Sequence, residues 1–431
     1  MDLNTELLSF ISRSPTAFHA VENLRAELLR AGYRELCEAE EWAVRPGDKL
    51  FVRRNASALI ALRVPAASPK GFMLAAAHSD SPSFKIKENA PAPTPDGYVR
   101  LNVEKYGGML CAPWLDRPLG IAGRVTLRTD KGLASRLYDS ARPVALIPQV
   151  AIHMDRSANE GKSYDAHVDM LPLFSLSGAK SFDAFLAAEL GVDEEALLSK
   201  DLFLYPFEEG RVWGAEGEFI SSPRLDDLQC VFGCAKGFLE AEDSESIACL
   251  CVFDNEEVGS GTKQGADSSF LADVLRRVCL ALGLDEGAYL RLVANSFMVS
   301  ADNAHAVHPN HAEHADRNDR PVLNSGVVIK YNANQRYTTD SVSAAVFGEI
   351  CRAADVRVQR YTNRADKPGG STLGNISLSH VSLDCVDIGL AQLAMHSCYE
   401  TAGAKDTLSL VRAMREFFSR SYQKDADGVR F

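Results

Sequence analysis

The sequence has no excess of basic residues and no long apolar segment. Its 46 lysines and arginines are outnumbered by 58 aspartates and glutamates, so the formal net charge is −12. This balance argues against binding to nucleic acids or anionic membrane surfaces, which both favour basic patches. No apolar run approaches the ~20 residues that a transmembrane helix needs. The N-terminal stretch MDLNTELLSF also lacks the pattern of a secretory signal.

Several chemical motifs are absent as well. The ten cysteines form no C-x-x-C pair and lie mostly in apolar segments, as Cys230 and Cys249 do. This pattern predicts buried thiols and a reducing, cytoplasmic location. No serine stands in a G-x-S-x-G turn, which argues against an α/β-hydrolase triad. The tight loop at residues 369–374 lacks the spacing and the lysine of a P-loop.

Strand-like and helical patterns alternate in the C-terminal half of the chain. Strands are predicted at residues 247–253, 292–299, 327–331, 356–361 and 385–389. Helices are predicted at residues 225–241, 269–282, 341–354 and 406–422. Further strands are predicted near the N-terminus, at residues 49–52, 59–64 and 72–77. The alternation predicts an α/β fold with a mostly parallel sheet that has helices on both faces.

Residues 89–218 have a different composition from the rest of the chain. Prolines stand at positions 91, 93, 95, 113 and 118, and short strand-like runs follow, with a helical pattern mainly at residues 181–190. We interpret this region as a β-rich insertion. Residues 1–88 and 219–431 are then expected to form one discontinuous domain.

The most distinctive stretch is CLCVFDNEEVGSG, at residues 249–261. An apolar run ends there in four polar residues, which include Glu256 and Glu257, and a Gly-Ser-Gly turn follows. Open α/β sheets place ligand sites at the carboxyl ends of their strands. Adjacent carboxylates repel unless a metal or a proton separates them. One glutamate is therefore expected to bind a metal and the other to act as a general base, with a solvated loop as the alternative.

Other acids and histidines stand at predicted strand ends and helix starts. His78 follows one strand, and Asp80, on the same face, can orient its ring. Asp226 and Asp227 lie in the first turn of a predicted helix, where one of them can bridge two metals, although helix capping equally explains acids there. Asp302 and His396 also follow predicted strands. Each of these residues taken alone also suits an ordinary structural role.

One segment contains four histidines spaced by three residues: His305, His308, His311 and His314. The spacing suggests a metal site, but Pro309 and the many charges predict a loop without one common face. We therefore interpret most of these histidines as structural or surface residues. His305 and His308 are the two nearest to Asp302 in the sequence. We expect one of them to lie beside the metal ligands.

Together these positions form one set of two histidines and three carboxylates. Such a set suits a pair of zinc ions that share one aspartate. Scattered positions are expected when several loops of an α/β sheet assemble one site. The predicted ligands are His78, Asp226, Glu257, Asp302 and His396.

Seven motifs resemble those of the aspartyl aminopeptidases, a family of cytosolic dinuclear zinc exopeptidases. The resemblance covers essentially the whole chain, and the motifs stand in the order of the family. They are AAAHSDSP (75–82), AIHMDR (151–156), SSPRLDDL (221–228), FDNEEVGSGT (253–262), SADNAHAVHPN (300–310), KYNANQRY (330–337) and AMHSCYE (394–400).

The resemblance implies a zinc-exopeptidase fold with an inserted dimerisation domain, and dimers that assemble into tetrahedral dodecamers. It assigns His78 and Asp302 to one zinc ion, Glu257 and His396 to the other, and Asp226 to both. Glu256 is implied as the general base, and Asp80 supports His78. Cobalt or manganese can replace zinc in sites of this kind.

The resemblance also implies removal of N-terminal aspartate or glutamate from peptides. Lys330 is the expected partner of the acidic side chain, and Tyr337 and the loop that ends at Gly374 are expected in the same pocket. His153 is implied to reach the active site of a neighbouring subunit. A surface position for the Lys330 side chain is the alternative.

Two other functions remain open from the sequence. The first is a different dinuclear zinc hydrolase, either an aminopeptidase of broad specificity or an N-acyl amino-acid deacylase. The second is a non-catalytic, assembling scaffold with a decayed site. The complete set of expected ligands and the base Glu256 argue against the scaffold.

Overall fold

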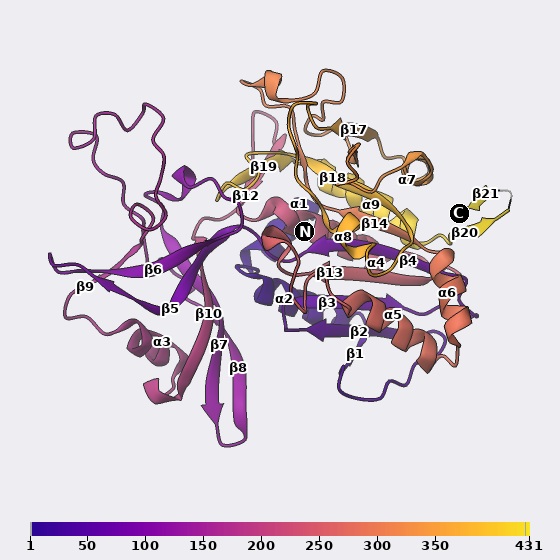
Figure 1. Ribbon diagram of the computed structural model, residues 1–431, viewed down its shortest axis with the longest axis horizontal. Helices are drawn as coiled ribbons and strands as arrows, with labels where there is room; N and C mark the ends of the chain where they lie inside the picture. The colour runs from indigo at the N-terminus through magenta and orange to yellow at the C-terminus, as the bar shows by residue number, and fades with distance from the viewer. Residues whose placement is uncertain (1, 427) are drawn as a thin grey trace.

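A large sheet and a smaller sheet form the two halves of the molecule (Figure 1). The computed structural model describes residues 2–426 and 428–431, and in these residues the large sheet has 13 strands and the smaller one six. The strands of the large sheet are β1 (Arg34–Leu36), β2 (Lys49–Arg54), β3 (Ala58–Arg63), β4 (Phe72–His78), β11 (Arg211–Trp213), β12 (Phe219–Ser222), β13 (Ile247–Phe253), β14 (Phe297–Ala301), β15 (Ala304–His305), β16 (Val327–Tyr331), β17 (Val358–Thr362), β18 (Asp384–Leu393) and β19 (Glu400–Gly403).

The centre of the large sheet consists of parallel strands that are buried on both faces. Strands β13, β4, β14 and β18 lie side by side and run parallel. On β4, Met73, Ala75 and Ala77 pack into one core, whereas Phe72, Leu74 and Ala76 pack into the other. The sequence of such a strand is a continuous apolar run, because alternate side chains enter different hydrophobic cores.

Helices cover both faces of the large sheet. One face packs against α1 (Leu3–Ser12), α2 (Ala17–Arg30), α4 (Leu225–Glu240), α7 (Ser341–Ala353) and α9 (Asp406–Phe418). The other face packs against α5 (Phe270–Ala281), α6 (Glu286–Ala294) and α8 (Leu373–Ser377). This arrangement confirms the predicted α/β fold with a mostly parallel sheet.

The smaller sheet is antiparallel and has a hydrophobic core of its own, which contains Phe84, Trp114 and Leu202. Its strands, in spatial order, are β8 (Gly132–Asp139), β7 (Leu119–Thr129), β10 (Leu197–Pro206), β5 (Ser83–Pro93), β6 (Tyr98–Tyr106) and β9 (Leu173–Leu176), and α3 (Phe182–Leu190) packs on it. Strand β5 starts before residue 89, and β11 of the large sheet starts before residue 219. The division of the chain into domains at these residues stays a prediction.

The predicted strand at residues 292–299 differs from the structure. Leu292 and Val293 form the buried side of α6 together with Tyr289, and β14 begins only at Phe297. The apolar run therefore combines the end of a helix with the start of a strand, which periodicity over so few residues does not separate. No helix in the described part of the chain is long and apolar enough to cross a membrane.

Candidate metal centre

Neighbouring parallel strands bring the predicted site residues to one edge of the large sheet. His78, the last residue of β4, is in register with Phe253, the last residue of β13. Glu257 follows β13 closely, and Asp302 follows β14, which lies on the other side of β4. Because the carboxyl ends of parallel strands meet at one edge, residues far apart in the sequence gather there.

Asp226 lies between two histidines and offers one carboxylate oxygen to each. His78 Nε2 is 3.5 Å from Asp226 Oδ1, and His396 Nε2 is 3.6 Å from Asp226 Oδ2. His396 Nε2 is also 3.3 Å from Glu257 Oε2. Two ligands of a tetrahedral zinc ion, each about 2.0–2.1 Å from the metal, are separated by about 3.3 Å. The distances around Asp226 are close to this separation.

Two groups of possible metal ligands share Asp226. The ligand atoms of each group lie within 4.8 Å of one another. One group also contains Glu257 and His396, and the other contains His78, Asp227 and Asp302. The structure therefore brings together all five residues that the sequence analysis predicts as ligands.

The charges and unpaired atoms of this centre fit divalent cations. Asp226 Oδ1, Asp227 Oδ1 and Glu257 Oε1 are buried and have no hydrogen-bond partner within the described part of the chain. Burial raises the pKa of Glu257 well above its usual range, with the charge of Asp226 as the next cause. Burial also raises the pKa of Asp302. A bound cation offsets the electrostatic repulsion between these buried carboxylates.

Asp80 connects His78 to the two adjacent glutamates. Its Oδ1 accepts a hydrogen bond from the Glu256 backbone amide at 3.1 Å, and its Oδ2 accepts one from the Glu257 amide at 3.2 Å. The Asp80 carbonyl oxygen lies 3.1 Å from His78 Nδ1. Burial raises the pKa of Glu256 to about 8. Asp80 thus holds the backbone of both glutamates, whose carboxylates lie near His78.

Besides Asp227, two further residues contact this centre that the sequence analysis does not predict as site residues. Glu400, fully buried on β19, accepts hydrogen bonds from the backbone amides of Asp226 at 3.0 Å and His396 at 2.8 Å. Its position at the end of the AMHSCYE motif is the signal that could have identified it. Tyr106 reaches Asp80 from the smaller sheet, and no local sequence pattern indicates this contact.

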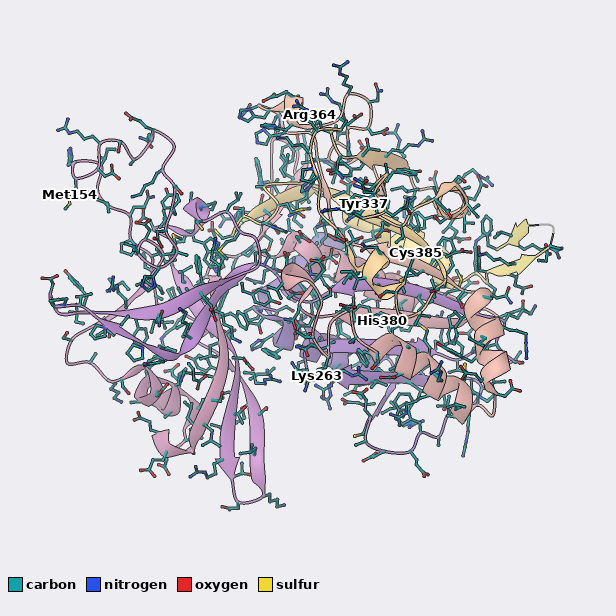
Figure 2. All side chains as sticks on the ribbon, viewed as in Figure 1. Met154, Lys263, Tyr337, Arg364, His380 and Cys385 are labelled. Carbon is teal, nitrogen blue, oxygen red and sulfur yellow. The ribbon has the colours of Figure 1, made fainter. Side chains whose placement is uncertain are left out.

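A cavity of about 160 Å³ opens beside the predicted ligands and contains the proposed specificity residues. Lys330 is buried, and its Nζ donates to the Asp302 carbonyl oxygen at 2.7 Å, so its side chain is not a surface lysine. Tyr337, labelled in Figure 2, lines the same cavity and lies beneath the Lys330 ammonium group. Residues 370–372 also line the cavity, whereas Gly374 lies in α8 against Asp387.

His153 and three of the four spaced histidines lie away from this centre. His153 is exposed, and Figure 2 shows its neighbour Met154 at the outer side of the smaller sheet, far from Tyr337. The structure therefore does not bring His153 to the centre of its own chain. All four spaced histidines are exposed, but His305 also lines the cavity, whereas the other three lie on the loop that follows. Those three are His308, His311 and His314.

A histidine–carboxylate centre at the carboxyl edge of an α/β sheet defines this molecule as a metal-dependent hydrolase. Residues 10–418 match the family described as Aminopeptidase I zinc metalloprotease (M18). A probable M18 family aminopeptidase 2 of Clostridium acetobutylicum is 43% identical over 429 residues, which cover 97% of this chain and 99% of that protein. The probable M18 family aminopeptidase 2 of Pseudomonas aeruginosa is also 43% identical, over 430 residues, with the same coverage.

Solved structures agree with this family assignment. Ape4, in a structure of its complex with Nbr1, has a TM-score of 0.93 at 34% identity, covering 96% of this chain and 85% of that chain. The mApe1 dodecamer of S. cerevisiae has a TM-score of 0.86 at 28% identity, covering 97% and 96% of the two chains. The chain belongs to the M18 family of zinc aminopeptidases, and its resemblance to the aspartyl aminopeptidase family is confirmed.

Proposed function

We propose that this M18 aminopeptidase uses two zinc ions to remove N-terminal aspartate and glutamate residues from peptides. The observation that carries the proposal is the position of Asp226, which offers one oxygen to the His78 side of the centre and the other to the His396 side. A carboxylate in that position suits two neighbouring cations better than one.

Each zinc ion would take two residues besides Asp226. His78 and Asp302 would hold one ion, and Glu257 and His396 the other. Zinc supplies a water of lowered pKa and polarises the scissile carbonyl group. The same imidazole and carboxylate ligands also accept cobalt or manganese.

Glu256 is the residue that moves the proton in this proposal. It stands next to the ligand Glu257, and Asp80 anchors the backbone amides of both residues. Burial raises the pKa of Glu256, which makes its carboxylate a stronger base than that of a free glutamate. In this role it would accept a proton from the attacking water and return it to the leaving amine. The carboxylates of both glutamates lie near His78, and in this proposal Glu257 binds zinc while Glu256 stays off the metal as the base.

Lys330 would recognise the acidic side chain of the substrate. Among the described residues that line the cavity it is the only lysine or arginine. An ammonium group has three donors, and Lys330 directs two of them to the carbonyl oxygens of Asp302 and Asn303. Lys330 Nζ also lies 3.7 Å from Asp302 Oδ2, so the ammonium group already faces one carboxylate. Its third donor would bind the substrate carboxylate, which needs such a partner in a buried pocket.

Self-association would complete the active site. Val150, Ile152 and Met154 surround His153 and are 49%, 49% and 82% exposed, respectively, which is unusual for apolar side chains that cluster in one loop. The mApe1 structure that resembles this chain is a dodecamer. We propose that dimers of this chain also build a dodecamer, in which His153 reaches the site of a neighbouring subunit and stabilises the reaction intermediate.

A cytoplasmic location completes the proposal. All ten cysteines are free thiols, and eight of them are buried. Unpaired cysteines in such number suit a reducing compartment.

The experiment that tests the function compares aspartyl-, glutamyl- and leucyl-p-nitroanilide as substrates of the zinc-loaded protein. We expect hydrolysis of the two acidic substrates and little hydrolysis of the leucyl substrate. An equal rate on the leucyl substrate would instead indicate an aminopeptidase of broad specificity. Hydrolysis of N-acyl amino acids alone would indicate a deacylase, and no hydrolysis with zinc, cobalt or manganese would indicate a scaffold.

A further inference from the structure

The exposed loop after β15 brings three possible metal ligands together outside the active site. His311 Nδ1 lies 3.1 Å from Glu313 Oε1, and His314 Nε2 lies 3.9 Å from the same oxygen. Ligand atoms of all three residues lie within 4.8 Å of one another. Ligands of one tetrahedral zinc ion are separated by about 3.3 Å, so small side-chain rotations are enough to place all three on one ion.

The backbone explains why histidines three residues apart meet here. Residues Ala312–His314 form a single 3-10 turn that His311 precedes. The His314 amide donates to the His311 carbonyl oxygen at 3.1 Å. Side chains at positions i and i+3 of a 3-10 turn lie above one another. The sequence predicts a loop without a common face, and this one turn supplies such a face for His311 and His314.

Two arginines hold this turn in place through its backbone. Arg320 Nη2 donates to the Ala312 carbonyl oxygen at 2.8 Å, and Arg364 Nη1 donates to the Glu313 carbonyl oxygen at 2.5 Å. Arg364 is labelled in Figure 2 at the outer end of this part of the molecule. Neither arginine is bonded to the Glu313 carboxylate in the described residues, so this carboxylate stays available to an ion.

We propose that His311, Glu313 and His314 form a loop metal site for a divalent ion such as zinc, copper or nickel. Two imidazoles and one carboxylate suit these ions, whereas magnesium and calcium prefer oxygen ligands alone. The ring of His308 lies 5.2 Å from the ring of His311, measured between centroids, and can supply a fourth ligand. The pKa of Glu313 is lowered by a backbone amide and by His311, so its carboxylate is ionised at neutral pH.

This loop metal site is independent of the proposed zinc centre. It shares no residue with the centre around Asp226, and its side chains are 60–66% exposed. The ion therefore retains water ligands and exchanges with the solution.

Equilibrium dialysis of the full-length protein over a range of free zinc concentrations, followed by elemental analysis, tests the proposal. The variant is the double substitution His311→Ala with His314→Ala. The matched control is His380→Ala, because His380 Nε2 also pairs with a surface carboxylate, at 2.8 Å from Asp267 Oδ1. We expect wild type and control to bind one more zinc ion per chain than the double variant at saturation. The difference does not depend on how many ions the active site holds.

Copper(II) added to the zinc-loaded protein provides a second measurement. Electron paramagnetic resonance should show coupling to two imidazole nitrogens in the wild type and in Glu313→Gln, with weaker copper binding in the latter. The double variant should lack this signal. Equal zinc counts in wild type and double variant, or the same copper signal in both, would overturn the proposal. Loss of the extra ion in His380→Ala alone would also overturn it.

Discussion

Tyr106, on β6 of the smaller sheet, donates a hydrogen bond to Asp80 Oδ2 at 2.6 Å, at the edge of the large sheet. Asn255, which directly precedes the two glutamates, donates to the Tyr106 hydroxyl oxygen at 2.7 Å. Asp80 also accepts the backbone amides of Glu256 and Glu257. The smaller sheet therefore takes part in holding the proposed catalytic turn.

Replacing this tyrosine tests that relationship. Tyr106→Phe removes one hydrogen bond from Asp80, and loss of such a supporting partner costs about 10-fold or more in activity. We expect kcat for an aspartyl substrate to fall about 10-fold while KM changes little. The control is Tyr138→Phe, because the Tyr138 hydroxyl is buried in the same sheet without a described partner. Equal losses in both variants would show that Tyr106 acts through general stability alone.

The adjacent glutamates should differ in what their replacement removes. Glu256→Gln removes the proposed base, and we expect kcat to fall by about 10²–10⁴-fold with the zinc content unchanged. Glu257→Gln weakens a proposed zinc ligand, and we expect loss of zinc together with loss of activity. Steady-state kinetics combined with elemental analysis distinguishes the two. Zinc loss in the Glu256 variant, with full zinc in the Glu257 variant, would reverse the assignment.

Lys330 should control substrate choice more than catalysis. Lys330→Met removes the proposed partner of the acidic side chain, and an unpaired buried charge costs about 2–5 kcal/mol. We expect the ratio of kcat/KM for aspartyl over leucyl substrates to fall roughly 100-fold. Lys200→Met is the matched control, since Lys200 is also buried and also faces a carboxylate, at 2.9 Å from Asp183 Oδ1, but lies in the smaller sheet. A ratio that does not change would contradict the role of Lys330.

His19 should make the protein sensitive to acid. Burial in the first turns of α2 lowers the pKa of His19 to about 4, with Arg224 adding to this effect and Asp139 opposing it. In the unfolded chain the pKa is about 6.5, so protonation favours unfolding as the pH falls from 6.5 to 4. A shift of this size corresponds to about 3 kcal/mol of lost stability.

Urea unfolding at pH 7 and at pH 4.5 measures this effect. The midpoint should fall less in His19→Gln than in the wild type, because the glutamine does not take up a proton. The exposed His167, replaced in the same way, is the control and should behave like the wild type. If both variants lose as much stability as the wild type, His19 is not a source of acid sensitivity.

Local sequence patterns located the strands that carry the site. The bounds predicted for β13 and β16 agree with the structure at both ends. β13 is a short apolar run closed by polar residues, and β16 is a short β-prone run that includes the buried Lys330. The strand-end rule then placed Glu257 and Asp302 at one edge of the sheet. The apolar pattern gave a wrong strand prediction for residues 292–294, because the buried side of a helix and a buried strand are equally apolar over so short a run.

The alternating α/β pattern, the acidic charge and the types of residue in the metal centre follow from the order of the amino acids alone. Three relationships appear only in the folded chain. Asp226 lies between His78 and His396, Glu400 accepts the backbone amides of Asp226 and His396, and Tyr106 reaches Asp80 from another sheet. Composition and periodicity act over a few neighbouring residues. Contacts between strands, sheets and loops depend on register and packing across the whole chain, and these are set only when the chain folds.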